Sequence, residues 1–392
     1  MHLIYAYSGC SPKMYKELVE SKGLRAQQQA QKYNQLLMEG FVANGATVDA
    51  VSSRPINRAV SKKLFFKSEK ETQCGIDYHY VPFINHSLLR AIFIFFSTFF
   101  KILTLRKREQ TALICDALGV SVAAAALLAA KIKRIKAVAI VTDVPSHRPT
   151  GSKMSTSEKI DLYLMKKFDA YLLLTRHMND VVNPKERPFI VLEGHSDIKM
   201  KEVKNDPDKK YDKKVCFYAG SLRRIYGIGN LVDAFVKSNI EDSELHIYGN
   251  GDYVEELKEL SKKYPNVKYM GIAPNEKIVE EELKSTLLVN PRPTNEEYTK
   301  YSFPSKNMEY MASGTPLLTT KLPGMPDEYC DYVYIIQEET VDGIKEKLCE
   351  ILNNPVSSLH EKGQKAKDFV MNHKNNVVQA KRVLEIIFEK VL

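Results

Sequence analysis

Short apolar runs alternate with helical stretches along most of this chain of 392 residues, and the alternation starts twice. The first series runs from a strand at His2–Ser8 to one at Phe189–Leu192. A polar segment at Lys199–Lys214 follows, and Val215–Gly220 opens the second series. Such alternation is typical of parallel sheets with helices on both faces. The sequence therefore predicts an α/β fold with two Rossmann-like parallel-sheet domains facing a central cleft.

The two series set the expected elements and boundaries. In the first half we expect strands at 2–8, 47–53, 78–83, 112–117, 137–142, 170–174 and 189–192, and helices at 26–44, 88–105, 120–130 and 155–168. In the second half we expect strands at 215–220, 245–248, 267–270, 287–290, 316–319 and 333–336, and helices at 228–237, 253–264, 276–284 and 306–313, followed by a helical tail with a capping box at Ser358–Glu361. The domains are then 1–195 and 214–372, joined by a linker at 196–213, with a C-terminal helix at 373–392 that could cross back to the first domain.

Composition limits which binding partners and which cellular compartment are expected for this protein. The net charge of +9 suits nucleic acid, an anionic membrane surface or phosphate-bearing substrates. No zinc spacing or RNA-binding signature accompanies it, so we expect no nucleic acid. The six cysteines form no C-x-x-C pair, and the N-terminus lacks a signal peptide's pattern, which indicates a reduced, cytoplasmic protein.

The most apolar segment is Leu88–Leu105, which is bracketed by Arg90 and Lys101 and followed by Arg106-Lys107-Arg108. Its uninterrupted core is too short to span a bilayer. Two interpretations stay open: a helix packed on a sheet, or one that also presents a Phe-rich face to the inner surface of the cell membrane.

Small residues and one arginine follow the predicted strands of the second half. They are Gly220 with Ser221, Gly249 in a Gly-x-Gly loop, Gly271, and Arg292 in Asn290-Pro291-Arg292-Pro293. Ligands of parallel sheets bind at the carboxyl ends of the strands, where glycine lets the backbone approach them. Each motif alone is an ordinary turn, and only their joint order points to a ligand site.

The run from Tyr301 to Pro316 carries the most chemistry. Pro304 suits the start of a helix, Ser305 is a good N-cap, and Gly314 ends the helix. Lys306 adds positive charge to the N–H groups of the first turn, and Glu309 lies one turn further on the same face. A diphosphate could bind at the positive helix start and a ribose could bind Glu309. The alternative is a capped surface helix with a Lys–Glu pair.

These motifs resemble those of glycosyltransferase family 4, retaining nucleotide-sugar transferases with the GT-B fold. The matching residues are Gly220-Ser221-Leu222 with Gly227, Tyr248–Gly251, Ser302–Pro316 and Leu322–Pro326. The resemblance implies donor binding in the second domain, acceptor binding in the first, and no metal or cofactor. The pattern is similar to the exopolysaccharide and capsule branch. Tyr301 departs from it, because a glutamate is common there.

The resemblance also implies roles for individual residues. Lys306, Arg292, the backbone at Ser305 and the Gly220–Ser221 loop, with Arg223 or Arg224, would stabilise charge on the departing diphosphate. Glu309 would hold the ribose hydroxyls. The expected donor-binding residues are Gly220, Ser221, Arg224, Gly249, Gly271, Tyr301, Phe303, Ser305, Lys306 and Glu309.

Candidates in the first half depend on position alone. Asp143 follows a buried strand and could orient the acceptor hydroxyl or the donor sugar, with a turn residue before Pro145 as the equal alternative. His147 and Gly9 are expected acceptor contacts.

Together these features favour a hexosyltransferase that moves a sugar from a UDP- or GDP-linked donor to a glycan or polyprenyl-linked acceptor during cell-surface polysaccharide synthesis. Two alternatives remain: a catalytically silent nucleotide-sugar-binding protein, to which Tyr301 points, and a related nucleotide-sugar epimerase.

Overall fold

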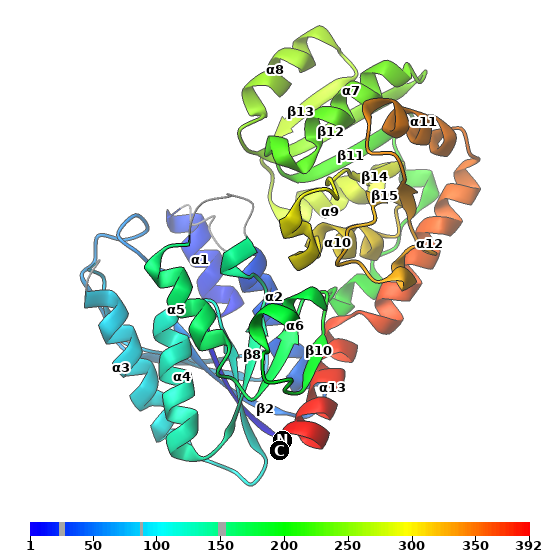
Figure 1. Cartoon of the computed structure of the whole chain (residues 1–392). Helices are drawn as coiled ribbons and strands as arrows, with labels where there is room; N and C mark the ends of the chain where they lie inside the picture. The colour runs from blue at the N-terminus through cyan, green and yellow to red at the C-terminus, as the bar shows by residue number, and fades with distance from the viewer. Residues whose placement is uncertain (23–27, 87–88, 148–153) are drawn as a thin grey trace. The chain divides into compact units, whose positions relative to one another are not determined.

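The computed structural model describes residues 1–22, 28–86, 89–147 and 154–392 (Figure 1). The chain divides into two compact units. Unit 1 comprises Met1–His195 and Asn376–Leu392, and unit 2 comprises Ser196–Asn375. Each unit is built on a mainly parallel sheet flanked by helices, which confirms the predicted α/β class with two Rossmann-like parallel-sheet domains.

Unit 1 contains an eight-stranded sheet in the order β10-β9-β8-β7-β1-β2-β5-β4. All neighbours are parallel except β4, which runs antiparallel to β5. The strands are β1 (His2–Ser8), β2 (Thr47–Ser53), β4 (Glu69–Gln73), β5 (Ile76–Tyr80), β7 (Thr111–Asp116), β8 (Lys136–Val141), β9 (Ala170–Leu173) and β10 (Phe189–Val191), with β3 (Phe65–Phe66) and β6 (Phe83–Ile84) paired separately. The helices are α1 (Pro12–Lys22), α2 (Gln28–Ala43), α3 (Leu89–Thr104), α4 (Val120–Lys133), α5 (Thr156–Met165), α6 (His177–Val182) and α13 (Asn376–Ile386), and the π-helix η7 (Ile387–Val391) follows α13.

Most first-half elements match their predicted ranges within a few residues, and the exceptions have physical causes. Strand β4 was missed because EKETQ is exposed and polar, and an edge strand needs no apolar face. The strand expected at 78–83 is wrong in extent, since pairing with β2 ends at Tyr80, before Pro82, and β6 begins at Phe83. Helix α1 was also missed, although Met14, Tyr15, Leu18 and Val19 recur at helical spacing.

The last helix, α13, is part of unit 1. Asn376 Nδ2 donates to Leu36 O on α2 at 3.0 Å, and Gln379 Nε2 donates to Gly194 O at 3.0 Å. A Cβ at Gly40 would lie 2.2 Å from Asn376 O. Glycine at this position therefore permits the close approach of α2 and α13.

Unit 2 has a six-stranded, fully parallel sheet in the order β13-β12-β11-β14-β15-β16. Numbered within the unit, this is the 3-2-1-4-5-6 order of dinucleotide-binding domains, and the order reverses between β11 and β14. The strands are β11 (Lys214–Ser221), β12 (Ser243–Asn250), β13 (Val267–Gly271), β14 (Leu287–Asn290), β15 (Leu317–Thr320) and β16 (Tyr334–Ile336). The helices are α7 (Ile228–Ser238), α8 (Val254–Lys263), α9 (Asn275–Lys284), α10 (Ser305–Ser313), α11 (Val341–Leu352) and α12 (Val356–His373), with 3-10 turns η4 (Arg224–Tyr226) and η5 (Glu297–Tyr301) near the site.

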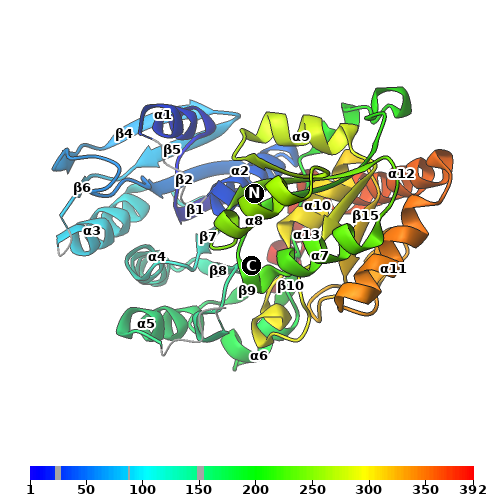
Figure 2. The same cartoon turned by 90° about the horizontal axis from the view of Figure 1, so that it is seen from above.

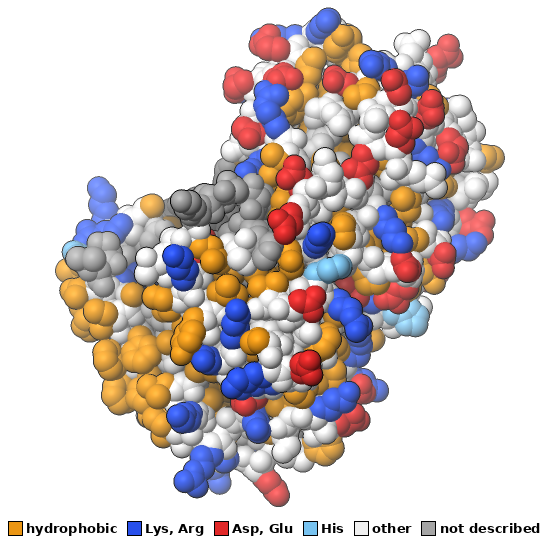
Figure 3. Space-filling view, viewed as in Figure 1, with side chains coloured by type: hydrophobic (Ala, Val, Ile, Leu, Met, Phe, Trp, Pro, Cys, Tyr) orange, Lys and Arg blue, Asp and Glu red, His pale blue; other side chains and the backbone are white. Residues whose placement is uncertain are grey.

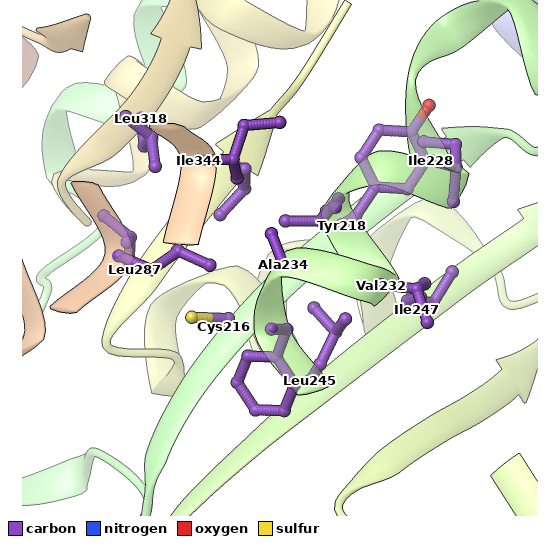
Figure 4. Packing of buried hydrophobic residues seen from close by; sticks show 14 of the residues in the cluster. Cys216, Tyr218, Ile228, Val232, Ala234, Leu245, Ile247, Leu287, Leu318 and Ile344 are labelled. Carbon is purple, nitrogen blue, oxygen red and sulfur yellow. The ribbon is translucent and has the colours of Figure 1, made fainter. Parts of the chain in front are cut away.

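One core of unit 2 lies between its sheet and helices α7, α8 and α11 (Figure 4). Cys216 and Leu245 on the strands face Val232 and Ala234 on α7, and all are buried. Cys216 is a free thiol whose pKa burial raises to about 12, so it acts as a small hydrophobe, as predicted.

Two predicted polar features of unit 2 differ in the structure. The segment at 199–214 packs on the unit: Asn205 Nδ2 bonds Thr315 Oγ1 at 2.7 Å, and Lys210 Nζ bonds Ser285 O at 2.8 Å. The capping box at Ser358–Glu361 is wrong, because α12 already begins at Val356 after Pro355. Proline at the helix boundary leaves Ser358 inside the first turn.

Candidate active site at the strand ends of unit 2

The candidate site lies at the carboxyl ends of β11 and β14, where the strand order of unit 2 reverses. Pairing between these strands covers Cys216 with Leu287 and Phe217 with Leu288. Beyond this point the Tyr310 hydroxyl of α10 takes over: it accepts from Ala219 N at 2.8 Å and donates to Ala219 O at 3.2 Å. A buried tyrosine thus satisfies the backbone N–H and C=O of Ala219 where β11 diverges from β14. Parallel sheets of this order bind ligands at that position.

Glycines bring the loops after β11 and β12 together, backbone against backbone. Gly249 has φ +137°, and a Cβ there would lie 1.8 Å from Gly220 O. A Cβ at Gly251 would lie 2.2 Å from Leu222 O. Leu222 N also donates to Asn250 O at 2.9 Å. These glycines are required by close packing, and they leave backbone instead of side chains at the strand ends.

A third glycine joins the loop after β11 to the loop after β14. Gly227 has φ +77°, and a Cβ there would lie 2.2 Å from Pro291 O. Arg292, which follows Pro291, places its guanidinium 4.6 Å from the Tyr226 ring centroid and 5.1 Å from that of Tyr298. Its Nη1 donates to Ser302 Oγ at 3.1 Å, and its buried Nε has no hydrogen-bond partner among the described residues. Arg292 is therefore oriented by two aromatic rings and by Ser302.

Helix α10 brings Lys306 and Glu309 to the same edge. Lys306 Nζ lies 2.8 Å from Glu309 Oε2, and the side chains are 22% and 25% exposed. Burial lowers the pKa of Lys306, but the carboxylates of Glu309 and Glu282 outweigh it and leave the pKa raised. The lysine is consequently charged at neutral pH, in a setting partly shielded from water.

The first turn of α10 differs from the prediction. Pro304 is the N-cap, Ser305 is the first helical residue, and no side chain of the described residues caps the turn. The prediction of Ser305 as N-cap is wrong because Pro304 already holds the extended conformation of that position. Ser305 is exposed, so its backbone N–H lies at an uncapped helix start.

A buried amide network fixes α10 on the sheet. Asn290 Nδ2, at the end of β14, donates to Asn307 Oδ1 at 2.6 Å. Asn307 Nδ2 reaches Thr319 Oγ1 on β15 at 3.3 Å, and Thr319 Oγ1 donates back to Asn290 O at 3.1 Å. Asn307 and Tyr310 are positioning residues that were not predicted from the sequence. Polar residues on the inner face of a short helix were the available signal.

Three other predicted donor-binding residues take different positions. Arg224 is exposed: its guanidinium lies 2.5 Å from Glu256 Oε2 and over the Tyr253 ring, on the side of α8. Phe303 is buried, with its ring centroid 5.2 Å from that of Tyr329, so its side chain is part of the core. Tyr301 ends η5 and is half-buried.

Gly271 and Ser221 lie at open positions. Gly271 ends β13 with φ +75°, and a Cβ there would meet nothing within 4 Å. Ser221 ends β11 and is exposed, next to Gly220, whose neighbour across the pair is Gly249. Of the predicted catalytic and donor-binding residues, the structure thus gathers Gly220, Ser221, Gly249, Arg292, Ser305, Lys306 and Glu309 at one edge of the sheet.

The candidates of unit 1 are not gathered in this way. Gly9 is buried, and a Cβ there would lie 2.2 Å from Tyr7 Cε2, so packing explains it. Asp143 follows β8 and is half-buried. His147 ends a 3-10 turn, and its side chain lies outside the described residues. Within the described ranges, the group able to hold a metal ion is Asp49, Asp77 and His79 on β2 and β5 of unit 1.

Comparisons with known proteins agree with this geometry. Residues 199–369 match the family model "Glycosyl transferases group 1". A comparison with curated protein sequences found no match.

Solved structures resemble the chain at low identity. S. aureus TarM, in complex with fondaparinux, alpha-GlcNAc-glycerol and UDP, is 16% identical with a TM-score of 0.57, over 79% of this chain but 62% of the TarM chain. Anabaena HepE in complex with UDP is 14% identical with a TM-score of 0.63, over 99% of this chain and 100% of the HepE chain. The lipopolysaccharide outer core galactosyltransferase WaaB is 15% identical with a TM-score of 0.63, over 100% of both chains. We conclude that the chain has the GT-B fold and that residues 199–369 form a domain of the glycosyl transferases group 1 family, which confirms the predicted family resemblance for this part of the chain.

Proposed function

We propose that this protein is a retaining glycosyltransferase that moves a sugar from a UDP-linked donor to a glycan or lipid-linked acceptor in cell-surface polysaccharide synthesis. The observation that carries the proposal is the convergence of Arg292, charged Lys306 and the uncapped start of α10 at the switch point of a Rossmann-ordered sheet. Several neighbours were solved with UDP or a UDP-sugar, which favours UDP over GDP as the donor nucleotide.

In the proposed reaction the bond between the anomeric carbon and the β-phosphate oxygen breaks, the anomeric carbon bonds to the acceptor hydroxyl oxygen, and the hydroxyl proton passes to the departing diphosphate. Negative charge grows on the departing diphosphate. Fixed cations and N–H donors stabilise that charge best when they are already oriented before reaction. Arg292 is held between two tyrosines and Lys306 by Glu309, so both meet this condition.

Glu309 has two roles in the proposal. It holds Lys306 in place, and its carboxylate accepts hydrogen bonds from the ribose hydroxyls of the donor. The backbone of the Gly220–Ser221 and Gly249 loops supplies close approach to the nucleotide without side chains in the way. No metal is required by this scheme, because Lys306 and Arg292 provide the positive charge. Asp143 and His147 remain candidate acceptor contacts.

The test is release of nucleoside diphosphate by the purified protein. UDP- and GDP-sugars are offered in turn with a membrane lipid extract, and Lys306→Ala is compared with the parent protein. We expect release from a UDP-sugar and a loss of about 100-fold or more in kcat/KM for Lys306→Ala.

Lys347→Ala is the matched control. Lys347 Nζ lies 2.8 Å from Glu350 Oε1 on α11, also an i,i+3 pair, and its side chain is 25% exposed. Equal losses in both variants would contradict the proposal. Tight UDP binding without release under any acceptor would favour the silent binding protein, and isomerised UDP-sugar would favour the epimerase.

A further inference from the structure

Helix α3 of unit 1 is apolar on the side that faces water. Its buried positions are Ile94, Thr98 and Ile102. Its exposed side includes Ile92, Phe96 at 52% and Phe100 at 58% exposure. The Phe96 and Phe100 rings stack on each other with centroids 6.5 Å apart. An apolar stripe of helical spacing on the outer side of a helix indicates a surface that is covered in use.

The neighbouring helices extend this stripe. Helices α3, α4 and α5 lie side by side in unit 1 (Figure 2). Leu128 and Ile132 on α4, and Ile160 and Tyr163 on α5, are each between 42% and 60% exposed. Hydrophobic side chains gather over these helices in the space-filling view, with basic side chains among them (Figure 3). The apolar surface is therefore a platform of three helices, and we call it the α3–α5 face.

The charged residues of segment 89–108, which includes α3, and of α4 are all basic. Residues 89–108 contain five basic residues and no acidic one, and α4 has Lys131 and Lys133 and no acidic residue. Two lysines also fix the helix ends: Lys133 Nζ donates to Leu105 O at 2.6 Å, and Lys107 Nζ donates to Arg134 O at 3.1 Å. These bonds hold positive charge at the carboxyl ends of both α3 and α4.

We propose that the α3–α5 face docks on an anionic lipid bilayer, with the aromatic and aliphatic side chains inserted among the headgroups and the lysines and arginines on the lipid phosphates. A bilayer supplies both an apolar layer and negative charge over a wide area, which matches this combination. No helix in the described ranges is long and apolar enough to cross a membrane, so the contact is at the surface. The inference extends the proposed function, because it gives the surface through which the enzyme would meet a lipid-linked acceptor.

Vesicle flotation tests the inference without donor or acceptor. The full chain is mixed with vesicles of phosphatidylcholine alone, or of phosphatidylcholine with phosphatidylglycerol. We expect binding to the anionic vesicles, and a loss of roughly tenfold or more in the double variant Phe96→Asp with Phe100→Asp. The control is Phe388→Asp on η7, an equally exposed phenylalanine at 57% that lies outside the face, and we expect it to bind as the parent does.

A charge variant completes the test. Arg106→Glu with Lys131→Glu is expected to lower binding to anionic vesicles by roughly tenfold, and added salt is expected to do the same to the parent protein. Failure of the parent to float with anionic vesicles would overturn the inference. A concentration-dependent dimer that is lost in the Phe96/Phe100 variant, with no vesicle binding, would also overturn it and assign the face to a second copy. Diphosphate release in solution is measured separately, so loss of either property is distinguishable from loss of the other.

Discussion

The two units use similar parallel sheets but hold their strand ends in different ways. In unit 2 the loops after β11, β12 and β14 touch through backbone at Gly249 and Gly227. In unit 1 the loop after β1 is held by side chains: Tyr7 Oη donates to Cys10 O at 3.2 Å, and Ser11 N donates to Tyr80 Oη at 2.9 Å. Backbone packing demands glycine and leaves a readable motif, whereas side-chain packing can be met by many residues. The difference explains why a candidate ligand site could be predicted from glycine motifs in unit 2 but not in unit 1.

The strongest test of this comparison is Gly249→Ala. The new Cβ would lie 1.8 Å from Gly220 O at a positive φ, so the two loops must separate. We expect a loss of about 3 kcal/mol or more in the free energy of unfolding, measured with urea, together with loss of UDP binding.

Gly271→Ala is the matched control for that variant. It has φ +75° but open space around its Cβ, so only backbone strain of about 1 kcal/mol is expected. Similar losses in the two variants would show that strain, not close approach, makes glycine necessary.

The second prediction concerns the tyrosines that hold the two strand ends. Tyr310→Phe removes both hydrogen bonds to Ala219, and we expect a loss of about 2 kcal/mol in unfolding free energy. Tyr7→Phe removes one bond to Cys10 O, which also accepts from Gln31 Nε2, so about 0.5–1 kcal/mol is expected. A larger loss of unfolding free energy for Tyr7→Phe than for Tyr310→Phe would contradict this prediction.

The third prediction uses a polar network on β1, β2 and β5 of unit 1. Asp49 lies 2.8 Å from His2 Nε2 and 2.6 Å from His79 Nε2. Burial raises the pKa of Asp49, but these two hydrogen bonds outweigh it and hold the pKa well below its ordinary value.

A lowered carboxylate pKa stabilises the folded state above the unfolded-state pKa, and the stabilisation is lost as pH falls through the folded value. We expect Asp49→Asn to cost about 1–3 kcal/mol at neutral pH, a difference that shrinks below about pH 4 in urea titrations. A difference independent of pH would exclude the ionised network as its cause.

The smallest expected effect is that of Arg224→Ala. The structure directs this side chain to exposed Glu256, away from the residues gathered around Lys306. We expect UDP affinity to change by less than about twofold in calorimetry, since exposed ion pairs contribute little. A loss comparable to that of Arg292→Ala would restore the original prediction for Arg224.

The parts of the fold that could be read in advance are those with strong local patterns. Strands β1, β2 and β14 and helix α10 have buried runs or clear helix boundaries, and their predicted limits agree with the structure within one residue. Strand β4 could not be read, because its residues are exposed and only pairing with β5 defines it. Polar residues on the inner face of α10 were a signal for Asn307 and Tyr310, but their partners Asn290 and Ala219 could not be identified, since they are distant in sequence.

By itself the sequence determined that the protein consists of two β-α alternations and that a lysine and a glutamate lie one turn apart at the start of a helix after a strand. Those conclusions depend on local periodicity and backbone preferences, which neighbouring residues encode. Only the tertiary structure decided that Phe303 and Gly9 serve packing, that Arg224 faces α8, and that the exposed apolar residues of α3 join those of α4 and α5. Burial and partner choice are settled by contacts between distant segments, and local sequence does not encode them.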